Sequence, residues 1–195
     1  MTPENVLEFW FGSDPKAPLA KAPSWFKKDA AFDRQIKDTF EGLLEQAKKG
    51  ELDEWRTTSR GLLAFIVLLD QFSRNMYRDT PATFAQDPLA LEASMEGQRL
   101  GLDRELTTIE RQFFYLPMMH AEDLAMQRRC IEAYERLLES APDDVRAFTA
   151  NALDFGKRHL VIVERFGRFP HRNKILGRES TPAEIEFLAQ PGSSF

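Results

Sequence analysis

Cysteine is almost absent from this chain: of its 195 residues one, Cys130, is a cysteine. A single cysteine cannot form a disulfide within the chain, so nothing in the sequence requires an oxidising compartment. The neighbouring Arg128 and Arg129 favour a thiolate, but a lone cysteine on an amphipathic helix is typical of an inert packing residue. We therefore expect no reactive role for this thiol.

Long apolar runs and a leader sequence are also absent. The longest apolar run, "GLLAFIVLL" at residues 61–69, is far shorter than the roughly 20 residues that span a bilayer. The opening "MTPENVLEFWFG" contains acids and lacks the basic, apolar and small-residue order of a signal peptide. We expect a cytoplasmic protein with no membrane partner, folded as a single domain over residues 1–195.

An excess of positive charge is missing as well. The chain has 31 acidic and 26 basic residues and a formal net charge of −5. Broad binding to nucleic acid needs an excess of cations that face phosphates. Phe166 and Phe169 stand among arginines, where aromatic rings can stack on bases. Phe166, however, falls on the apolar face of a predicted helix, and we expect Phe169 to plug the turn that follows. We expect no nucleic-acid partner.

Strand signals are sparse, and helix signals recur. In four places a capping residue precedes a proline, which is the pattern of a helix start: Thr2-Pro3, Thr80-Pro81, Asp87-Pro88 and Thr181-Pro182. Pro117 lacks a backbone donor, so the segment that contains it should kink there or divide into two helices. We predict an all-α fold, a single right-handed stack of antiparallel helices, with helices over residues 3–11, 24–49, 56–78, 88–101, 107–139, 144–168 and 181–190.

The stretch "RFGRFPHRNKILGRES", residues 165–180, is rich in cations in a chain that is acidic overall. Arg165 and Arg168 share one face of a helix, and Pro170 turns the chain so that the following residues fold back over the same place. Arginine binds carboxylate or phosphate through two hydrogen bonds. We predict a pocket for an anionic small molecule or an acidic peptide, lined by Asp70, Arg74, Asn75, His120, Arg165, Arg168, His171, Arg172 and Asn173.

A structural role for the same arginines is the main alternative. They can cap helix C-termini and form ion pairs with Asp70, Glu164 or Glu179. A metal site made by His120, Asp123 and His159 has weaker support, because the dense histidine and cysteine spacing of zinc sites is absent. We expect no metal.

An enzyme is the second functional hypothesis. His120 or His171 would act as acid or base, with Glu122 or Asp70 orienting the imidazole and arginines stabilising charge. Such a site suits a small phosphorylated or carboxylated substrate. No glycine-rich phosphate loop and no nucleophile elbow is present, so the sequence predicts neither a cofactor nor a serine nucleophile.

Four stretches together resemble one known family. They are "VLEFWFG", "LDQFSRNMYRDTP", "FFYLPMMHAEDLAMQ" and "RFGRFPHRNKILGRESTPAE", and they extend over nearly the whole chain. The chain resembles the bacterial family catalogued as domain of unknown function 924. The resemblance implies a fold similar to the tetratricopeptide superhelix, and it supplies no catalytic residues. That family often has a serine where this chain has Ala121, which argues against a scheme that uses a hydroxyl there.

Overall fold

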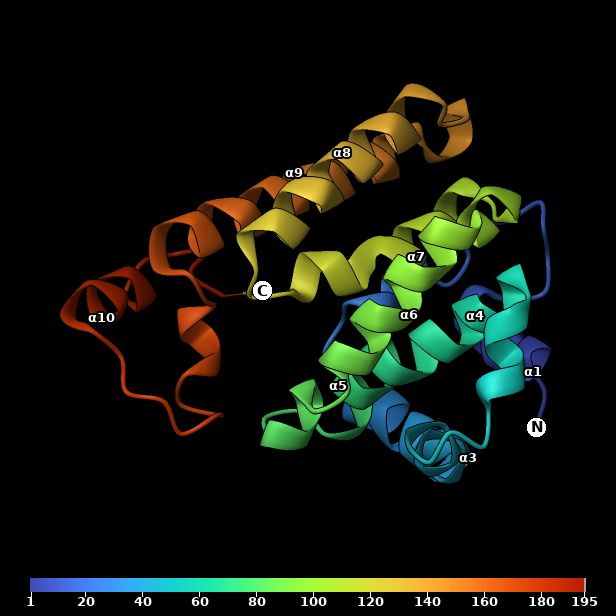
Figure 1. Cartoon of the computed structure of the whole chain (residues 1–195), viewed down its shortest axis with the longest axis horizontal. Coiled ribbons are helices and arrows are strands. Elements are labelled where there is room, and N and C mark those ends of the chain that lie inside the picture. The colour runs from blue at the N-terminus through green and yellow to red at the C-terminus, as the bar shows by residue number, and fades with distance from the viewer. Residues whose placement is uncertain (195) are drawn as a thin grey trace.

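The computed structural model describes residues 1–194, and within that range the chain forms helices and no strands (Figure 1). This confirms the all-α prediction. The α-helices are α1 (Pro3–Phe11), α2 (Ala22–Trp25), α3 (Ala30–Lys48), α4 (Ser59–Ile66), α5 (Ser73–Met76), α6 (Asp87–Leu100), α7 (Thr108–His120), α8 (Leu124–Glu139), α9 (Asp143–Phe166) and α10 (Pro182–Leu188). The shorter elements are the 3₁₀ turns η1 (Asp53–Thr57), η3 (Pro81–Phe84), η4 (Leu102–Glu105) and η5 (Pro170–Arg172), and the π-helical segment η2 (Val67–Phe72).

The predicted helix starts hold in two of four places. Helix α1 begins after Thr2 and α10 after Thr181, whose side chain accepts a hydrogen bond from the backbone N–H of Glu184. Thr80 precedes only the short turn η3. Asp87 is the first residue of α6 rather than its cap. Its carboxylate is therefore available for contacts elsewhere.

Two predicted long helices are each divided. The segment 24–49 breaks before Asp29, which caps α3 by accepting hydrogen bonds from the backbone N–H groups of Ala31 and Phe32. The segment 107–139 does not break at Pro117, which lies inside α7. The break comes after His120, where the chain leaves the helical path.

The side chain of Gln127 explains the position of that second break. Its Nε2 donates to the carbonyl oxygens of Met119 at 2.7 Å and Ala121 at 2.8 Å, groups that the end of α7 leaves without helical partners. Asp123 then caps α8, because its carboxylate accepts from the backbone N–H of Met126 at 2.9 Å. The end of α7 and the start of α8 are thus fixed by two side chains rather than by the proline.

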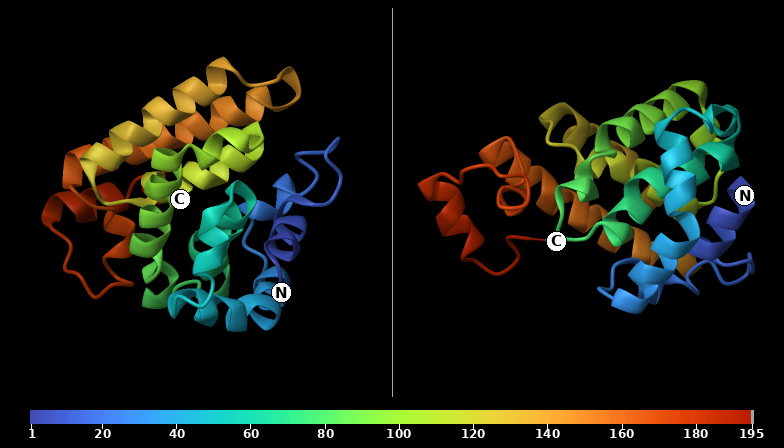
Figure 2. Two further views of the ribbon diagram at one scale, coloured as in Figure 1. Left: turned by 45° about the vertical axis from the view of Figure 1, so that its right-hand side comes forward. Right: turned by 90° about the horizontal axis from the view of Figure 1, so that it is seen from below.

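The helices pack in antiparallel pairs around an apolar interior. Helices α8 and α9 run side by side in opposite directions along one edge, and α1 and α3 lie at the opposite edge (Figures 1 and 2). The apolar segment 62–69 is at most 1% exposed at every residue. A second, small cluster of Ile162, Val163 and Phe169 packs with Phe187 of α10, which projects at one end (Figure 1). Within residues 1–194, no helix combines the length and apolarity needed to cross a bilayer.

Candidate functional site

One carboxylate of the predicted site is fully buried. Asp70 lies in the π-helical segment η2, directly after the apolar residues of α4, and is 0% exposed. A π-helical turn is rare and is often found at functional sites, because the wider turn displaces side chains from the regular helical register. An ionised group here must be paired with hydrogen-bond donors or opposite charges.

Three side chains supply those partners. Gln71 Nε2 donates to Oδ2 of Asp70 at 2.6 Å, and His120 Nδ1 lies 2.8 Å from Oδ1. Arg74, one helical turn later, places a guanidinium nitrogen 3.3 Å from the same carboxylate. The sequence predicted that Asp70, Arg74 and His120 share a site, and the structure brings these three side chains into contact.

The charge states of Asp70 and His120 follow from this environment. Burial raises the pKa of Asp70, but the attraction of Arg74 and His120 and the hydrogen bonds from His120 and Gln71 outweigh it, so the pKa lies well below its usual range. Burial lowers the pKa of His120, and the positive charge of Arg74 lowers it further, against the opposing effect of Asp70. At neutral pH, Asp70 is therefore ionised and His120 is neutral.

A second carboxylate connects two of the predicted arginines. Asp87, at the start of α6, accepts two hydrogen bonds from Arg74, at 2.8 and 3.1 Å. Arg172 of η5 reaches the same carboxylate at 3.3 Å and donates to the backbone carbonyl of His120 at 3.0 Å. Sequence analysis missed Asp87, because the proline after it marked the residue as a helix cap.

The guanidinium of Arg172 is enclosed. Phe84 and Phe169 lie on it with ring centroids 4.5 and 4.6 Å from its central carbon, and the residue is 6% exposed. Among the described residues its Nε has no hydrogen-bond partner. Burial and the charge of Arg74 outweigh the attraction of Asp87 and lower the pKa of Arg172 to about 10.

The chain's three histidines gather beside this arginine from three separate elements. The rings of His120 in α7 and His159 in α9 have centroids 6.3 Å apart. The ring of Phe169 lies 5.4 Å from that of His159 and 5.6 Å from that of His171 in η5. Burial lowers the pKa of His159 to about 3 and that of His171 to about 4. The group His120, His159, His171 and Arg172 is called the histidine–arginine cluster below.

Two predicted arginines have partners outside this cluster. Arg168 forms a two-point ion pair with Glu184 of α10, at 2.7 and 2.8 Å. Arg165 is exposed, with its guanidinium 4.7 Å from the ring of Phe166 and 5.8 Å from that of Phe187. The structural alternative named Asp70, Glu164 or Glu179 as partners of the arginines. Arg168 instead pairs with Glu184, and the named pairing that the structure contains is that of Arg74 with Asp70.

The two predicted asparagines also bond elsewhere. Asn75 donates to Asp33 of α3 at 2.7 Å. Asn173 donates to the hydroxyl of Ser180 at 3.0 Å and accepts from Arg178 at 3.0 Å. Both residues are buried, and the hydrogen bonds of their side chains lie outside the group of Asp70, Arg74 and His120.

Glu122 does not hydrogen-bond His120, the role that one catalytic hypothesis gave it. Its carboxylate accepts from two nitrogens of Arg178, at 2.6 and 2.9 Å, and from the backbone N–H of Phe169 at 2.8 Å. Asp70 holds the imidazole instead. Glu122 and Arg178 together attach the segment after α9 to the turn between α7 and α8.

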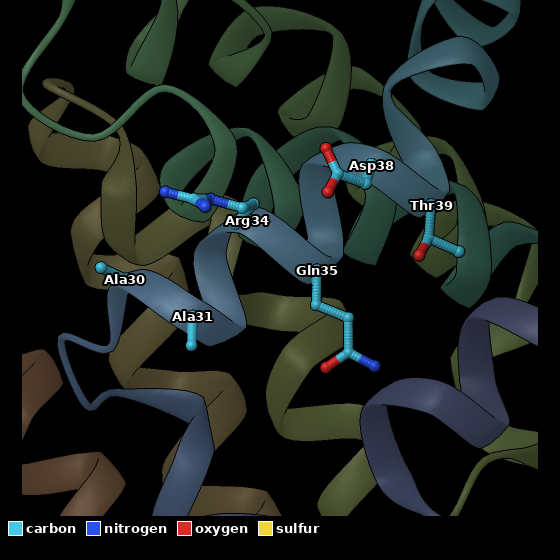
Figure 3. A pocket seen from close by; sticks show the side chains of 6 residues that line it. All are labelled: Ala30, Ala31, Arg34, Gln35, Asp38 and Thr39. Carbon is cyan, nitrogen blue, oxygen red and sulfur yellow. The ribbon is translucent and has the colours of Figure 1, made fainter.

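Two surface hollows lie away from these residues. One, of about 500 Å³, runs along α3 and is lined by Ala30, Ala31, Arg34, Gln35, Asp38 and Thr39 (Figure 3). The other, of about 650 Å³, is lined by Arg56, Glu92, Met95, Glu96, Arg99 and Arg129. Neither contains a residue of the predicted set.

The weak metal hypothesis has no geometric support in the described part of the chain. The carboxylate of Asp123 is used to cap α8, and His159 Nδ1 bonds the backbone carbonyl of Phe155 at 2.8 Å. Across residues 1–194, no group of three or more histidine, cysteine, aspartate or glutamate side chains is arranged to hold a metal ion.

Comparison with known proteins gives a family and a fold. The family model described as "Bacterial protein of unknown function (DUF924)" matches residues 6–192. A solved structure of a protein of unknown function from Agrobacterium tumefaciens is similar, with 40% sequence identity, 96% of each chain covered and a TM-score of 0.82. No curated protein matches the chain.

Proposed function

The chain belongs to a bacterial family of unknown function, DUF924, and we propose from the geometry of its own site that it binds a small anionic molecule, a carboxylate or a phosphate, at the histidine–arginine cluster. The observation that carries the proposal is the state of Arg172. Its guanidinium is buried against two phenyl rings, with Nε unpaired among the described residues. Buried polar groups are almost always hydrogen-bonded, so an unpaired guanidinium nitrogen calls for a partner.

Charge balance supports an anion as that partner. Asp87 is shared, and its shorter contacts are with Arg74. Arg172 is therefore incompletely neutralised, in keeping with its lowered pKa. A carboxylate or phosphate beside Arg172 would offset the cost of burying the guanidinium and would favour protonation of the nearby imidazoles.

A small molecule fits this site better than an acidic peptide. The side chain of Arg172 is 8% exposed and that of His120 is 15% exposed, so only a small part of either side chain is accessible to a ligand. The cations that would extend a peptide-binding surface, Arg165 and Arg168, are directed to α10. We therefore restrict the proposal to small anions.

Thermal unfolding with inorganic phosphate and with succinate tests this proposal. A ligand that binds the folded state at ten times its Kd adds about 1.4 kcal/mol to the free energy of unfolding, so the melting temperature should rise with anion concentration. Arg172→Gln and His171→Gln should each remove most of that rise. Arg165→Gln, which changes an exposed cation outside the cluster, should leave it intact. An anion effect that is equal in all four proteins would overturn the proposal.

A further inference from the structure

We infer that His120 acts at this site as a general base, its Nε2 taking a proton from water or from a hydroxyl group of the bound anion, and that Asp70 is the positioning residue that aims it. The inference rests on the proposed function for the identity of the ligand. It also makes a claim that does not depend on the ligand, namely that Nε2 of His120 is a base, and the reactivity of this nitrogen can be measured without any ligand.

The hydrogen bond between Asp70 and His120 fixes the tautomer. An ionised carboxylate can only accept hydrogen bonds, so the contact of 2.8 Å between Asp70 Oδ1 and His120 Nδ1 requires the proton on Nδ1. A neutral imidazole that is protonated at Nδ1 has its lone pair on Nε2. The pair thus prepares Nε2 as an acceptor of protons.

The surrounding charges keep this base ready at neutral pH, because a general base must be unprotonated to act. Burial and Arg74 keep the imidazole neutral. Once Nε2 takes up a proton, the adjacent carboxylate of Asp70 stabilises the imidazolium. The charged and titratable groups that face the ring come from five elements and are Asp70, Arg74, Asp87, His159, His171 and Arg172.

His120 differs from His159 in the exposure of its side chain and in the hydrogen-bond partner of its Nδ1. Its side chain keeps 15% exposure, although its Nδ1 bonds a carboxylate that is 1% exposed. Among the described residues no hydrogen bond to its Nε2 is found. His159 is 6% exposed and bonds a neutral backbone carbonyl, which offers no charge to stabilise an imidazolium.

The step is a single proton transfer. The O–H bond of a water molecule, or of a hydroxyl group of the ligand beside its anionic group, breaks and leaves its electron pair on oxygen. An N–H bond forms on Nε2 of His120, and Nδ1 keeps its proton in the hydrogen bond to Asp70. No oxidant, reductant or metal is required.

Carbethoxylation by diethyl pyrocarbonate tests the inference, because this reagent acylates the lone-pair nitrogen of a neutral imidazole. The rate at each histidine is followed by mass spectrometry of peptides from the folded full-length chain at pH 7. We expect His120 to react faster than His159. We expect Asp70→Asn to slow the reaction at His120 about tenfold or more, since a charge-assisted hydrogen bond is worth at least 1.4 kcal/mol. The rate at His171 serves as the internal control and should change little.

A second measurement keeps the inference testable if Asp70→Asn does not fold. Nitrogen-15 NMR of the unaltered chain should report a neutral His120 protonated at Nδ1 at pH 7. The opposite tautomer, a charged imidazolium, or reactivity at His120 that does not depend on Asp70 overturns the inference.

Phosphate separates this inference from the proposed function. If phosphate slows carbethoxylation of His120, both are supported. A fast reaction that depends on Asp70 but is unaffected by phosphate supports the base and overturns the anion site. A slow reaction at His120 together with a thermal shift by phosphate overturns the base and supports the anion site.

Discussion

At the scale of single residues, the ion pairs of this protein differ in how deeply they are buried, and that difference decides how much each contributes to stability. The pair between Glu122 and Arg178 is partly buried, and the same carboxylate also accepts the backbone N–H of Phe169. The pair between Glu164 and Arg128 is exposed on both sides: 58% of the Glu164 side chain and 61% of the Arg128 side chain are accessible. Exposed pairs contribute about 0–1 kcal/mol, whereas hydrogen bonds to partly buried charges contribute about 1.5–3.

We therefore predict that Glu122→Gln lowers the free energy of unfolding by about 2 kcal/mol, because it removes the charge that pairs with Arg178. Glu164→Gln is the matched control and should change it by less than about 0.5 kcal/mol. Urea unfolding at pH 7 measures both. Equal effects of the two substitutions would mean that Glu122 does not anchor the segment after α9.

At the scale of helices, close packing depends on glycines that the sequence does not distinguish from one another. A Cβ at Gly97 of α6 would lie 2.4 Å from Cδ2 of Leu62 and 2.5 Å from Cζ of Phe114, both in the core. A Cβ at Gly42 of α3 would meet no atom within 4 Å. Both glycines are inside helices, where alanine is intrinsically favoured by about 1 kcal/mol.

These two positions give opposite predictions for the same substitution. Gly97→Ala should destabilise the protein by about 1–2 kcal/mol net, because the cost of overpacking the contact between α6, α4 and α7 exceeds the gain in helix propensity. Gly42→Ala should stabilise it by up to about 1 kcal/mol. Thermal or urea unfolding measures both changes. If Gly97→Ala is stabilising, α6 does not approach α4 as closely as the structure indicates.

Which segments form helices could be predicted, because caps and apolar periodicity depend on residues that are close together in the sequence. Thr181 caps α10 as predicted, in a capping box with Glu184, and residues 62–69 are buried as their apolar character requires. The π-helical segment was not predictable, because the displacement of Asp70 depends on partners such as His120, 50 residues away. The break after His120 was assigned to Pro117 because the bonds of Gln127 to the end of α7 are likewise set by tertiary contacts.

The candidate site was predictable only in part, for a related reason. Residue type and spacing pointed to Asp70, Arg74, His120 and Arg172, and these side chains meet. The same reasoning grouped Arg165 with them, because sequence spacing does not show that α10 folds back over this part of α9. Asp87 was assigned a local capping role, since its pairing with two distant arginines leaves no mark in the sequence around it.

At the scale of the whole molecule, the lowered pKa values of the histidines in the cluster make stability depend on pH. The pKa of His159 is lowered to about 3 and that of His171 to about 4, below their ordinary value near 6.5, with burial as the main cause. Below about pH 6.5 the unfolded chain therefore binds protons that the folded chain does not. Stability must then fall as pH falls from 6.5 towards 4.

Carboxylates lose their contribution in a lower window. Burial raises the pKa of Glu122, but hydrogen bonds from Arg178 and the backbone of Phe169 outweigh it, and the net pKa is lowered. Such a group stabilises the folded state above its unfolded pKa, near 4.3, and this contribution is lost as pH falls through the folded pKa. The interval from pH 6.5 to 5 consequently reports mainly on the histidines.

We predict that His159→Gln makes the free energy of unfolding less dependent on pH in that interval, by up to about 1.4 kcal/mol per pH unit, the value for one proton. The groups near the ring are His120 in α7, the carbonyl of Phe155 in α9, and His171 and Arg172 in η5. Glutamine cannot take up a proton in either state, so its contribution is the same across the interval. Urea unfolding at pH 6.5, 6.0, 5.5 and 5.0 measures the slope for both proteins. An unchanged slope would show that His159 takes up its proton in the folded state as readily as in the unfolded chain, and that the cluster is more open to water than its burial implies.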